Sequence, residues 1–258
     1  ISDYIFQLKN AENYAHRRMA LLEVAKKQEE KLAFNAVVNA MSDASYEIRI
    51  LALEKIDLIN KFSKKNAIQK IMKIANTDEK TLVQAAAIET LGKLTDLELK
   101  GIFAKGLESK SYSVIGKSLV AMYYVDKQQA IKKSRALPDA IRKILATPLT
   151  RIYIEEKDEK ELPFISKSVL SGMFLTGDDA TKAIYQKAFT QISESNNSEA
   201  IQNLVNDMVV KGTQYKSFNF DKVVINLMRR MVQDQKTKNT LNRTKNTAII
   251  KEAMAKLL

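Results

Sequence analysis

Four segments in the first half of the chain repeat one short helical pattern. They begin at His16, Ile48, Val83 and Val114, so that successive copies start 32, 35 and 31 residues apart. Each copy has a small residue at its fifth position, an apolar residue at its sixth, and a further apolar residue three positions later. A period of this length is typical of helical-repeat arrays, in which each helix pair buries its apolar face only by stacking on its neighbours. The alternative is that amphipathic helices share the spacing by chance, because the fourth copy is degraded.

The repeated positions predict which residues are buried. The small residues are Ala20, Ala52, Ala87 and Ser118, and the apolar residues that follow them are Leu21, Leu53, Ile88 and Leu119. We expect the three alanines to lie where helices approach closely and Leu21, Leu53 and Ile88 to be buried. Five residues before the second, third and fourth copies the chain has Asp43, Asp78 and Ser109. Their side chains can accept the free N–H groups at a helix start.

Composition agrees with an all-helical chain. Only 7 Gly and 3 Pro occur in 258 residues, which leaves few residues for the turns that connect strands. There is no Cys, so disulfides and thiol chemistry are excluded. No apolar run approaches the roughly 18 residues that a membrane-spanning helix requires. We therefore predict an all-α fold, an α-α superhelix of about a dozen antiparallel helices.

The repeat pattern ends near residue 145, and this divides the chain into three predicted parts. Residues 1–145 form the repeats, residues 146–163 form a connection, and residues 164–258 continue the same superhelix irregularly. Thr147–Pro148 is expected to stop a helix, and the charge run Glu155–Glu161 favours an exposed connection or a ragged helix over a true domain linker. Predicted helices elsewhere include Glu47–Asn60 and Thr240–Leu258.

Positive charge is concentrated at the end of the chain. The chain has a net charge of +12, and residues 211–258 carry 11 Lys and Arg against Asp221, Asp234 and Glu252. Such a segment can mark a nucleic-acid or acidic membrane surface. We favour a solvated helix face, because the aromatic residues Tyr215, Phe218 and Phe220 stand at one end of the segment and do not alternate with the basic residues.

Two strings carry a resemblance to known repeat families. Asp43 with Ile48-Arg49-Ile50-Leu51-Ala52-Leu53, and Asp78 with Val83-Gln84-Ala85-Ala86-Ala87-Ile88, resemble HEAT and HEAT-like repeats. More specifically, Ala15–Val24, Ser42–Leu53 and Leu162–Asp179 are similar to the C-terminal helical domain of gluzincin zinc aminopeptidases of the aminopeptidase N type. His16 stands where that family has Asp.

The aminopeptidase resemblance implies a non-catalytic role for this chain. It would be a cap domain that restricts access to the catalytic chamber and stabilises the closed enzyme. Its partner would be the catalytic domain of the same polypeptide, with zinc bound there and peptides touching the chamber wall. That domain would precede Ile1, and because the chain begins with Ile1 and not Met we expect a fragment of a longer protein or a processed one.

No residue pattern predicts catalysis, cofactor binding or metal binding in this chain itself. His16 is the only histidine, so the His-Glu-x-x-His zinc motif is absent. His16 shares its register position with Ile48 and Val83, and we expect it to be packed at an interface. Gly101–Gly106 has the glycine spacing of a phosphate-binding loop without the Lys and Ser or Thr that follow it. Asp178-Asp179 is better explained as a helix N-cap than as a pair of catalytic acids.

Two functional hypotheses remain from the sequence. The first is the peptidase cap domain. The second is a free-standing HEAT-type adaptor that binds a protein or a polyanion through its concave or basic face. Nucleic acid is the less favoured partner, no enzymatic activity is expected of the chain alone, and the compartment stays open between cytoplasm and periplasm.

Overall fold

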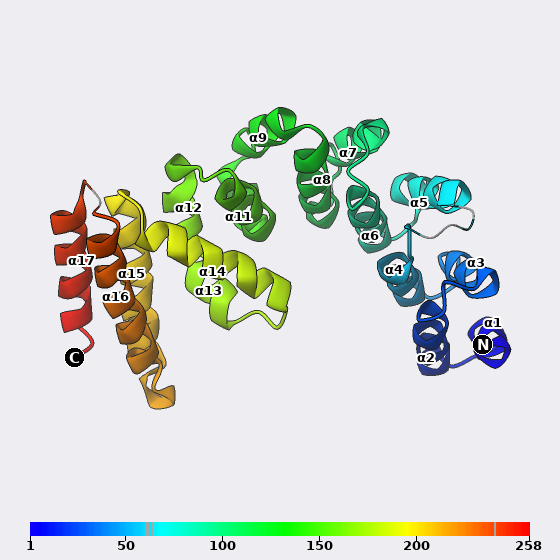
Figure 1. Cartoon of the computed structure of the whole chain (residues 1–258), viewed down its shortest axis with the longest axis horizontal. Coiled ribbons are helices and arrows are strands. Elements are labelled where there is room, and N and C mark those ends of the chain that lie inside the picture. The colour runs from blue at the N-terminus through cyan, green and yellow to red at the C-terminus, as the bar shows by residue number, and fades with distance from the viewer. Residues whose placement is uncertain (60–61, 63, 240) are drawn as a thin grey trace. The chain divides into compact units, whose positions relative to one another are not determined.

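The computed structural model describes residues 1–59, 62, 64–239 and 241–258. These residues form seventeen α-helices and three short 3₁₀ helices without any strand (Figure 1). The predicted all-α, HEAT-like α-α superhelix class is confirmed. The helices are more numerous than the predicted dozen. The chain separates into two compact units, Ile1–Ile144 and Leu145–Leu258.

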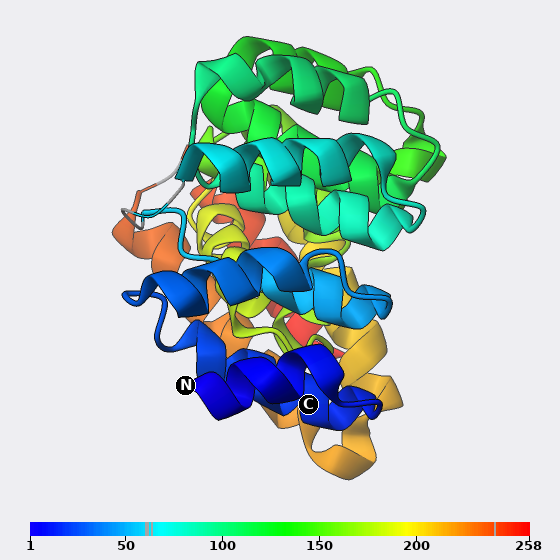
Figure 2. The same cartoon turned by 90° about the vertical axis from the view of Figure 1, so that its right-hand side faces the viewer.

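Unit 1 consists of helix pairs arranged in two rows. The outer row contains α1, α3, α5 and α7, and the inner row on the concave side of the unit contains α2, α4, α6 and α8 (Figure 1). Figure 2 shows successive pairs stacked side by side. The helices are α1 (Ser2–Asn10), α2 (Tyr14–Ala25), α3 (Lys31–Ala40), α4 (Tyr46–Lys55), α5 (Lys64–Thr77), α6 (Thr81–Gly92), α7 (Lys100–Gly106), α8 (Tyr112–Val125), α9 (Lys127–Arg135) and α10 (Asp139–Ile144).

The repeated sequence positions form the contact between the rows. All four copies lie on the inner row, and the small and apolar residues at their fifth and sixth positions are fully or almost fully buried, as predicted. Close approach is clearest between α7 and α8, where a Cβ at Gly106 would lie 2.0 Å from Ser118 Oγ. Small residues at this register therefore let neighbouring helices pack closely.

Unit 2 combines shorter helices with a group of three long ones. Its helices are α11 (Ala146–Glu155), α12 (Leu162–Ser166), α13 (Val169–Phe174), α14 (Asp179–Ser193), α15 (Ser198–Gln214), α16 (Phe220–Thr237) and α17 (Arg243–Ala255). Each of α15, α16 and α17 packs against the other two, and α14 packs against α11, α13 and α16.

A buried polar network joins the long helices of unit 2. The Gln235 amide donates hydrogen bonds to the carbonyls of Ser193 and Ser195, at 2.7 and 2.9 Å, and accepts one from the Asn246 amide at 3.0 Å. Ser198 Oγ donates to Asn246 Oδ1 at 2.7 Å. The carbonyls at the end of an α-helix have no partner within the helix, so the side chains of α16 and α17 satisfy the end of α14.

The helices are interrupted close to the predicted end of the repeats, since α10 ends at Ile144 and the second compact unit begins at Leu145. A helix ends at Ile144, shortly before Thr147–Pro148, and Pro148 itself lies in the first turn of the next helix, α11, where its missing N–H costs no helical hydrogen bond. Residues 146–163 contain α11, the 3₁₀ helix Glu159–Glu161 and the start of α12. That residues 164–258 continue the superhelix of residues 1–145 stays a prediction.

Two other predicted helices differ at their ends. The helix expected over Glu47–Asn60 ends at Lys55, and the one expected over Thr240–Leu258 begins at Arg243. Asn60 and Thr240 themselves lie outside the described residues. Among the helices of the described chain, none combines the length and apolar character needed to cross a membrane.

Candidate functional site

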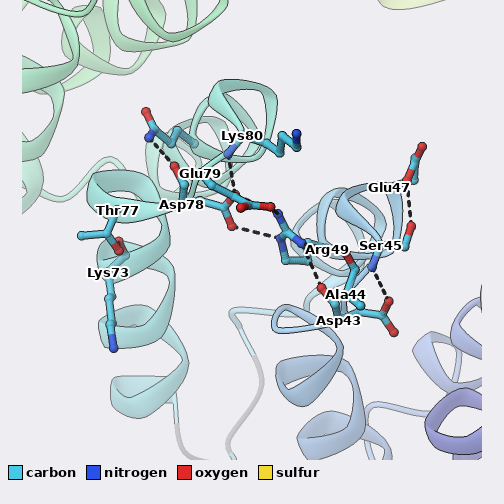
Figure 3. Close-up of polar contacts among 11 residues, drawn as sticks. Asp43, Ala44, Ser45, Glu47, Arg49, Lys73, Thr77, Asp78, Glu79 and Lys80 are labelled. Atoms are coloured by element: carbon cyan, nitrogen blue, oxygen red, sulfur yellow. Dashed lines mark hydrogen bonds and ion pairs between the residues drawn. The ribbon is translucent and has the colours of Figure 1, made fainter.

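Two Arg–Asp ion pairs connect successive helix pairs of unit 1. Arg17 Nε lies 3.2 Å from Asp43 Oδ2. Arg49 binds Asp78 with two hydrogen bonds, from Nε to Oδ2 at 3.0 Å and from its terminal nitrogen to Oδ1 at 2.9 Å (Figure 3). Each Arg is the second residue of a sequence copy, and each Asp precedes the next copy by five residues. The same interaction is therefore repeated from one helix pair to the next.

Between the third and fourth copies of the repeat, neither the Arg nor the Asp of this ion pair is present. Gln84 occupies the position of Arg17 and Arg49, and Ser109 occupies the position of Asp43 and Asp78. The Gln84 amide donates instead to the backbone carbonyl of Asp78 at 2.6 Å. Loss of both partners leaves no buried charge uncompensated, which is the costly outcome of losing only one.

The two aspartates also bind the backbone, but at the N-cap residue that precedes each helix and not, as was predicted, at the free N–H groups of the helix. Asp43 Oδ1 accepts a hydrogen bond from the Ser45 N–H at 2.8 Å, and Asp78 Oδ1 accepts one from the Lys80 N–H at 2.9 Å (Figure 3). Ser109 Oγ does the same for the Ser111 N–H at 3.1 Å. The sequence analysis missed the arginine partners of the aspartates, although the matched positions of Arg17 and Arg49 could have indicated them.

An open cleft of about 740 Å³ lies beside the second ion pair. Its lining residues come from the end of α3, from α4, from one face of α5 and from the loop before α6: Met41, Ser42, Asp43, Arg49, Gln69, Lys70, Lys73, Ile74, Thr77, Asp78 and Glu79. Lys70 connects α5 to α3, since its Nζ donates to the Val38 carbonyl at 2.8 Å. Burial lowers the pKa of Lys70.

Several polar side chains at this cleft bind groups on neighbouring helices and loops. Arg49 is bound to Asp78 and to the carbonyls of Asp43 and Ala44. Among the described residues no group of three or more His, Cys, Asp and Glu side chains could hold a metal ion. Arg49 therefore connects successive helix pairs on this side of unit 1.

The inner-row helices of unit 1 carry six aromatic or apolar side chains that are exposed or partly exposed: Tyr14, Met19, Tyr46, Leu82, Tyr112 and Tyr124. We call these residues the inner tyrosine face. Tyr14, Tyr46 and Tyr112 are the first residues of α2, α4 and α8, so the repeat places the same residue type at the same position. A hydrogen bond to Glu47 and its negative charge raise the pKa of Tyr46.

The structure also shows the surroundings of His16 and of Gly101–Gly106, which the sequence analysis considered as candidates. His16 is exposed, so the prediction that it is packed is wrong. Helix α2 is the first of the inner row and has a row neighbour on one side only, unlike the helices that carry Ile48 and Val83. Gly101–Gly106 lies within α7 and forms no loop.

Asp178 acts as the predicted N-cap of α14. Its carboxylate accepts hydrogen bonds from the N–H groups of Ala180 and Thr181. The Thr181 side chain and these backbone donors lower the pKa of Asp178. Asp179, the other member of the acidic pair, is exposed and lies 3.2 Å from Lys182 Nζ. The two carboxylates therefore bind different partners.

Comparisons with known proteins correct the family resemblance. No family model matches the chain, and no curated protein matches it. A solved structure of the complex of CpcE and CpcF of phycocyanin lyase from Nostoc sp. PCC7120 is similar over 99% of this chain and 93% of that chain, with 14% sequence identity and a TM-score of 0.48.

The identification as a zinc aminopeptidase C-terminal domain is therefore wrong, and the terms aminopeptidase, metallopeptidase and zinc are withdrawn with it. Two of the strings that suggested it, Ala15–Val24 and Ser42–Leu53, are sequence patterns of helical repeats, because their Ala and Leu positions are buried and their Arg and Asp residues form the ion pairs. A cofactor-free chain stays a prediction.

Proposed function

We propose that this chain is a HEAT-type binding protein that holds a protein partner on the inner tyrosine face of unit 1. The observation that carries the proposal is the repeated exposure of aromatic and large apolar side chains along α2, α4, α6 and α8. Tyrosine and methionine are enriched in protein interfaces, and tyrosine is among the residue types that contribute most binding free energy.

The physical properties of these residues suit recognition. A tyrosine ring buries a large area on binding, has only two side-chain torsions to restrict, and retains a hydroxyl group for a hydrogen bond. Helices α2 and α4, which carry Tyr14 and Tyr46, are joined to the next helix pair by the Arg17–Asp43 and Arg49–Asp78 ion pairs. A face that is already ordered before binding loses less conformational entropy on association.

Charges on the inner row indicate what kind of partner surface fits. Glu47 and Glu54 on α4 are exposed, and hydrogen bonds, first that from the Ser45 hydroxyl, lower the pKa of Glu47 and favour its ionised form. Glu89 on α6 is paired with Lys117 on α8 at 2.7 Å. A partner with apolar side chains and a basic group opposite α4 would complement this face in shape and charge.

The test begins with photo-crosslinking in the native cells. A photoreactive phenylalanine analogue replaces Met19, Leu82 or Tyr112 on the inner row, and Leu32 on the outer helix α3 serves as the matched exposed control. We expect one protein to be crosslinked from the inner positions and not from Leu32. The protein identified is then purified and titrated against this chain by calorimetry.

The titration decides the proposal. Tyr14→Ala and Tyr112→Ala should each weaken binding of the purified partner by roughly tenfold, the effect of removing an interface hot spot, while thermal unfolding stays unchanged. Leu32→Ala should leave the affinity unchanged. Equal crosslinking from the inner and outer positions, or an affinity that neither tyrosine variant alters, would contradict the proposal.

A further inference from the structure

The open cleft beside the Arg49–Asp78 ion pair is lined on one side by a flank of α5. Its volume of about 740 Å³ is that of a site for a small molecule. Lys70, Lys73 and Thr77 follow one another at steps of three and four residues, which places them on one flank of the helix. Figure 3 shows Lys73 and Thr77 on α5 and Arg49 on the opposite side, on α4. The cleft therefore lies between α5 and the start of α4.

The three carboxylates that line this cleft are already close to arginines. Arg17 Nε lies 3.2 Å from Asp43 Oδ2, and Arg49 binds both oxygens of Asp78. Glu79, whose side chain is 77% exposed, lies 3.8 Å from the same Arg49 guanidinium. In the part of the chain that the structure describes, none of these carboxylates forms an ion pair with a lysine. The lysines of the cleft are therefore left without an acidic partner.

Lys70 and Lys73 contribute two amines to the cleft, and neither forms an ion pair among the described residues. Lys70 is half-buried, and its Nζ donates to the Val38 carbonyl, a neutral group, at 2.8 Å. Burial without a compensating anion lowers the pKa of Lys70. In Figure 3 the Lys73 amine points away from Asp78 and Glu79. An anion bound beside these two amines would therefore stabilise their charged forms.

We propose that this cleft binds the phosphate monoester group of a small molecule between the amines of Lys70 and Lys73. The proposal goes beyond the function proposed for the inner tyrosine face and does not depend on it. A phosphate monoester has a charge of about −1.5 to −2 at neutral pH, which matches two ammonium groups, and its oxygens accept hydrogen bonds from lysine. The rest of the molecule would contact apolar atoms of Met41 and Ile74 and the Gln69 amide, which also line the cleft.

Charge and size favour this ligand over other partners. A carboxylate brings a single negative charge to two cations. Duplex nucleic acid is bound through many phosphate contacts, whereas two lysines line this cleft. A metal ion would need the carboxylates, and Asp43 and Asp78 are bound by arginines. A small phosphate monoester is the class of ligand that satisfies both amines and fits the volume.

The experiment titrates the full chain with phenyl phosphate at neutral pH and constant ionic strength. NMR correlations between Hε, Cε and Nζ of isotope-labelled lysines report each amine separately. We expect the Lys70 and Lys73 signals to shift along one binding curve. Lys65, an exposed lysine of α5 that does not line the cleft, is the internal control and should not respond. Benzoate carries the same ring with one charge and should bind at least roughly fivefold more weakly, because it makes fewer charge-assisted hydrogen bonds.

Variants of the chain separate binding from a purely structural role of Lys70. Lys73→Met removes an amine without an ion pair and should weaken phenyl phosphate binding by roughly fivefold or more, with an unchanged melting temperature. Lys70→Met should weaken binding similarly, although it also loses the link to Val38. Glu79→Gln removes a negative charge from the lining and should tighten binding by about twofold or more through reduced repulsion. Lys65→Met is the matched control and should bind like the unchanged chain.

Other outcomes overturn the proposal. Signals of Lys70 and Lys73 that do not move, or that move no more than that of Lys65, would show that phosphate is not bound in this cleft. An unchanged affinity in Lys73→Met would reduce Lys70 to a link between α5 and α3. Benzoate binding as tight as that of phenyl phosphate would assign the cleft to carboxylates. Tighter binding of a phosphoserine peptide than of phenyl phosphate would assign it to a phosphorylated protein segment instead of a small molecule.

Discussion

The backbone of Gly172 in α13 lies directly against the ring of Tyr185 in α14, so that a Cβ at position 172 would be 1.9 Å from Tyr185 Cδ2. The ring is buried, and Tyr185 Oη lies within hydrogen-bonding distance of Thr147 Oγ1, at 3.1 Å. The tyrosine is therefore held at both ends and cannot move aside at low cost. Glycine is required here by the close approach of two helices.

Replacing this glycine should destabilise unit 2. Gly172→Ala forces the ring and α13 apart, and overpacking of this kind costs about 1–3 kcal/mol or more. Gly177→Ala is the control, since nothing lies within 4 Å of its Cβ position, and it should change the free energy of unfolding by less than about 1 kcal/mol. Urea denaturation followed by circular dichroism measures both. Equal stability of the two variants would show that the α13–α14 contact is looser than described.

The Arg49–Asp78 pair should contribute more to stability than an exposed ion pair. Both side chains are 9% exposed, so Arg49→Ala leaves an almost buried carboxylate without its partner, at a cost of about 3–5 kcal/mol for a fully buried pair. Lys117→Ala breaks the Lys117–Glu89 pair, whose members are 42% and 46% exposed, and should cost less than about 1 kcal/mol. In a double-mutant cycle, adding Asp78→Ala to Arg49→Ala should recover part of the loss. Additive effects would mean that the two residues do not interact.

Gln235 should be essential to unit 2 in a way that its exposed neighbour on α16 is not. Gln235→Ala removes the donor to the Ser193 and Ser195 carbonyls and the acceptor of the Asn246 amide, and each buried group left unsatisfied costs about 1–3 kcal/mol. Gln233→Ala changes the same residue type two positions earlier, on the exposed face. Chemical denaturation should show a large loss for the first variant and a change within about 0.5 kcal/mol for the second. Comparable losses would argue against the network.

Acid should weaken the attachment of α9 through Asp126. A hydrogen bond from Lys100 Nζ at 2.6 Å, and one from the Gln129 N–H, lower the pKa of Asp126 in the folded chain. A lowered folded pKa contributes stability that is present above the unfolded value, near 4, and is lost as the pH falls through the folded value. Asp126→Asn and Lys100→Met should both flatten the fall in melting temperature over this acid range. An unchanged pH profile in both variants would exclude Asp126 as a contributor.

Local patterns in the sequence were enough to determine the helical architecture of the first half. Residues that face a neighbouring helix recur with the helical period. This recurrence predicted the burial of Ala20, Ala52, Ala87, Leu21, Leu53 and Ile88. Asp178, the N-cap of α14, was recognisable for a similar reason, since a cap bonds to backbone only two or three residues away. Interactions between residues that are close in the sequence can therefore be predicted without a structure.

Tertiary structure alone decided which distant groups meet. Arg49 and Asp78 are 29 residues apart, and Gln235 reaches carbonyls about 40 residues away. Nothing in either local sequence specifies such a partner, because the contact exists only once helix pairs have stacked. The exposure of His16 was likewise set by which neighbouring helices are present to cover it. The sequence of this protein therefore determined its repeating helices and their buried faces, and the packing of those helices determined the ion pairs, the buried network and the surfaces left open for partners.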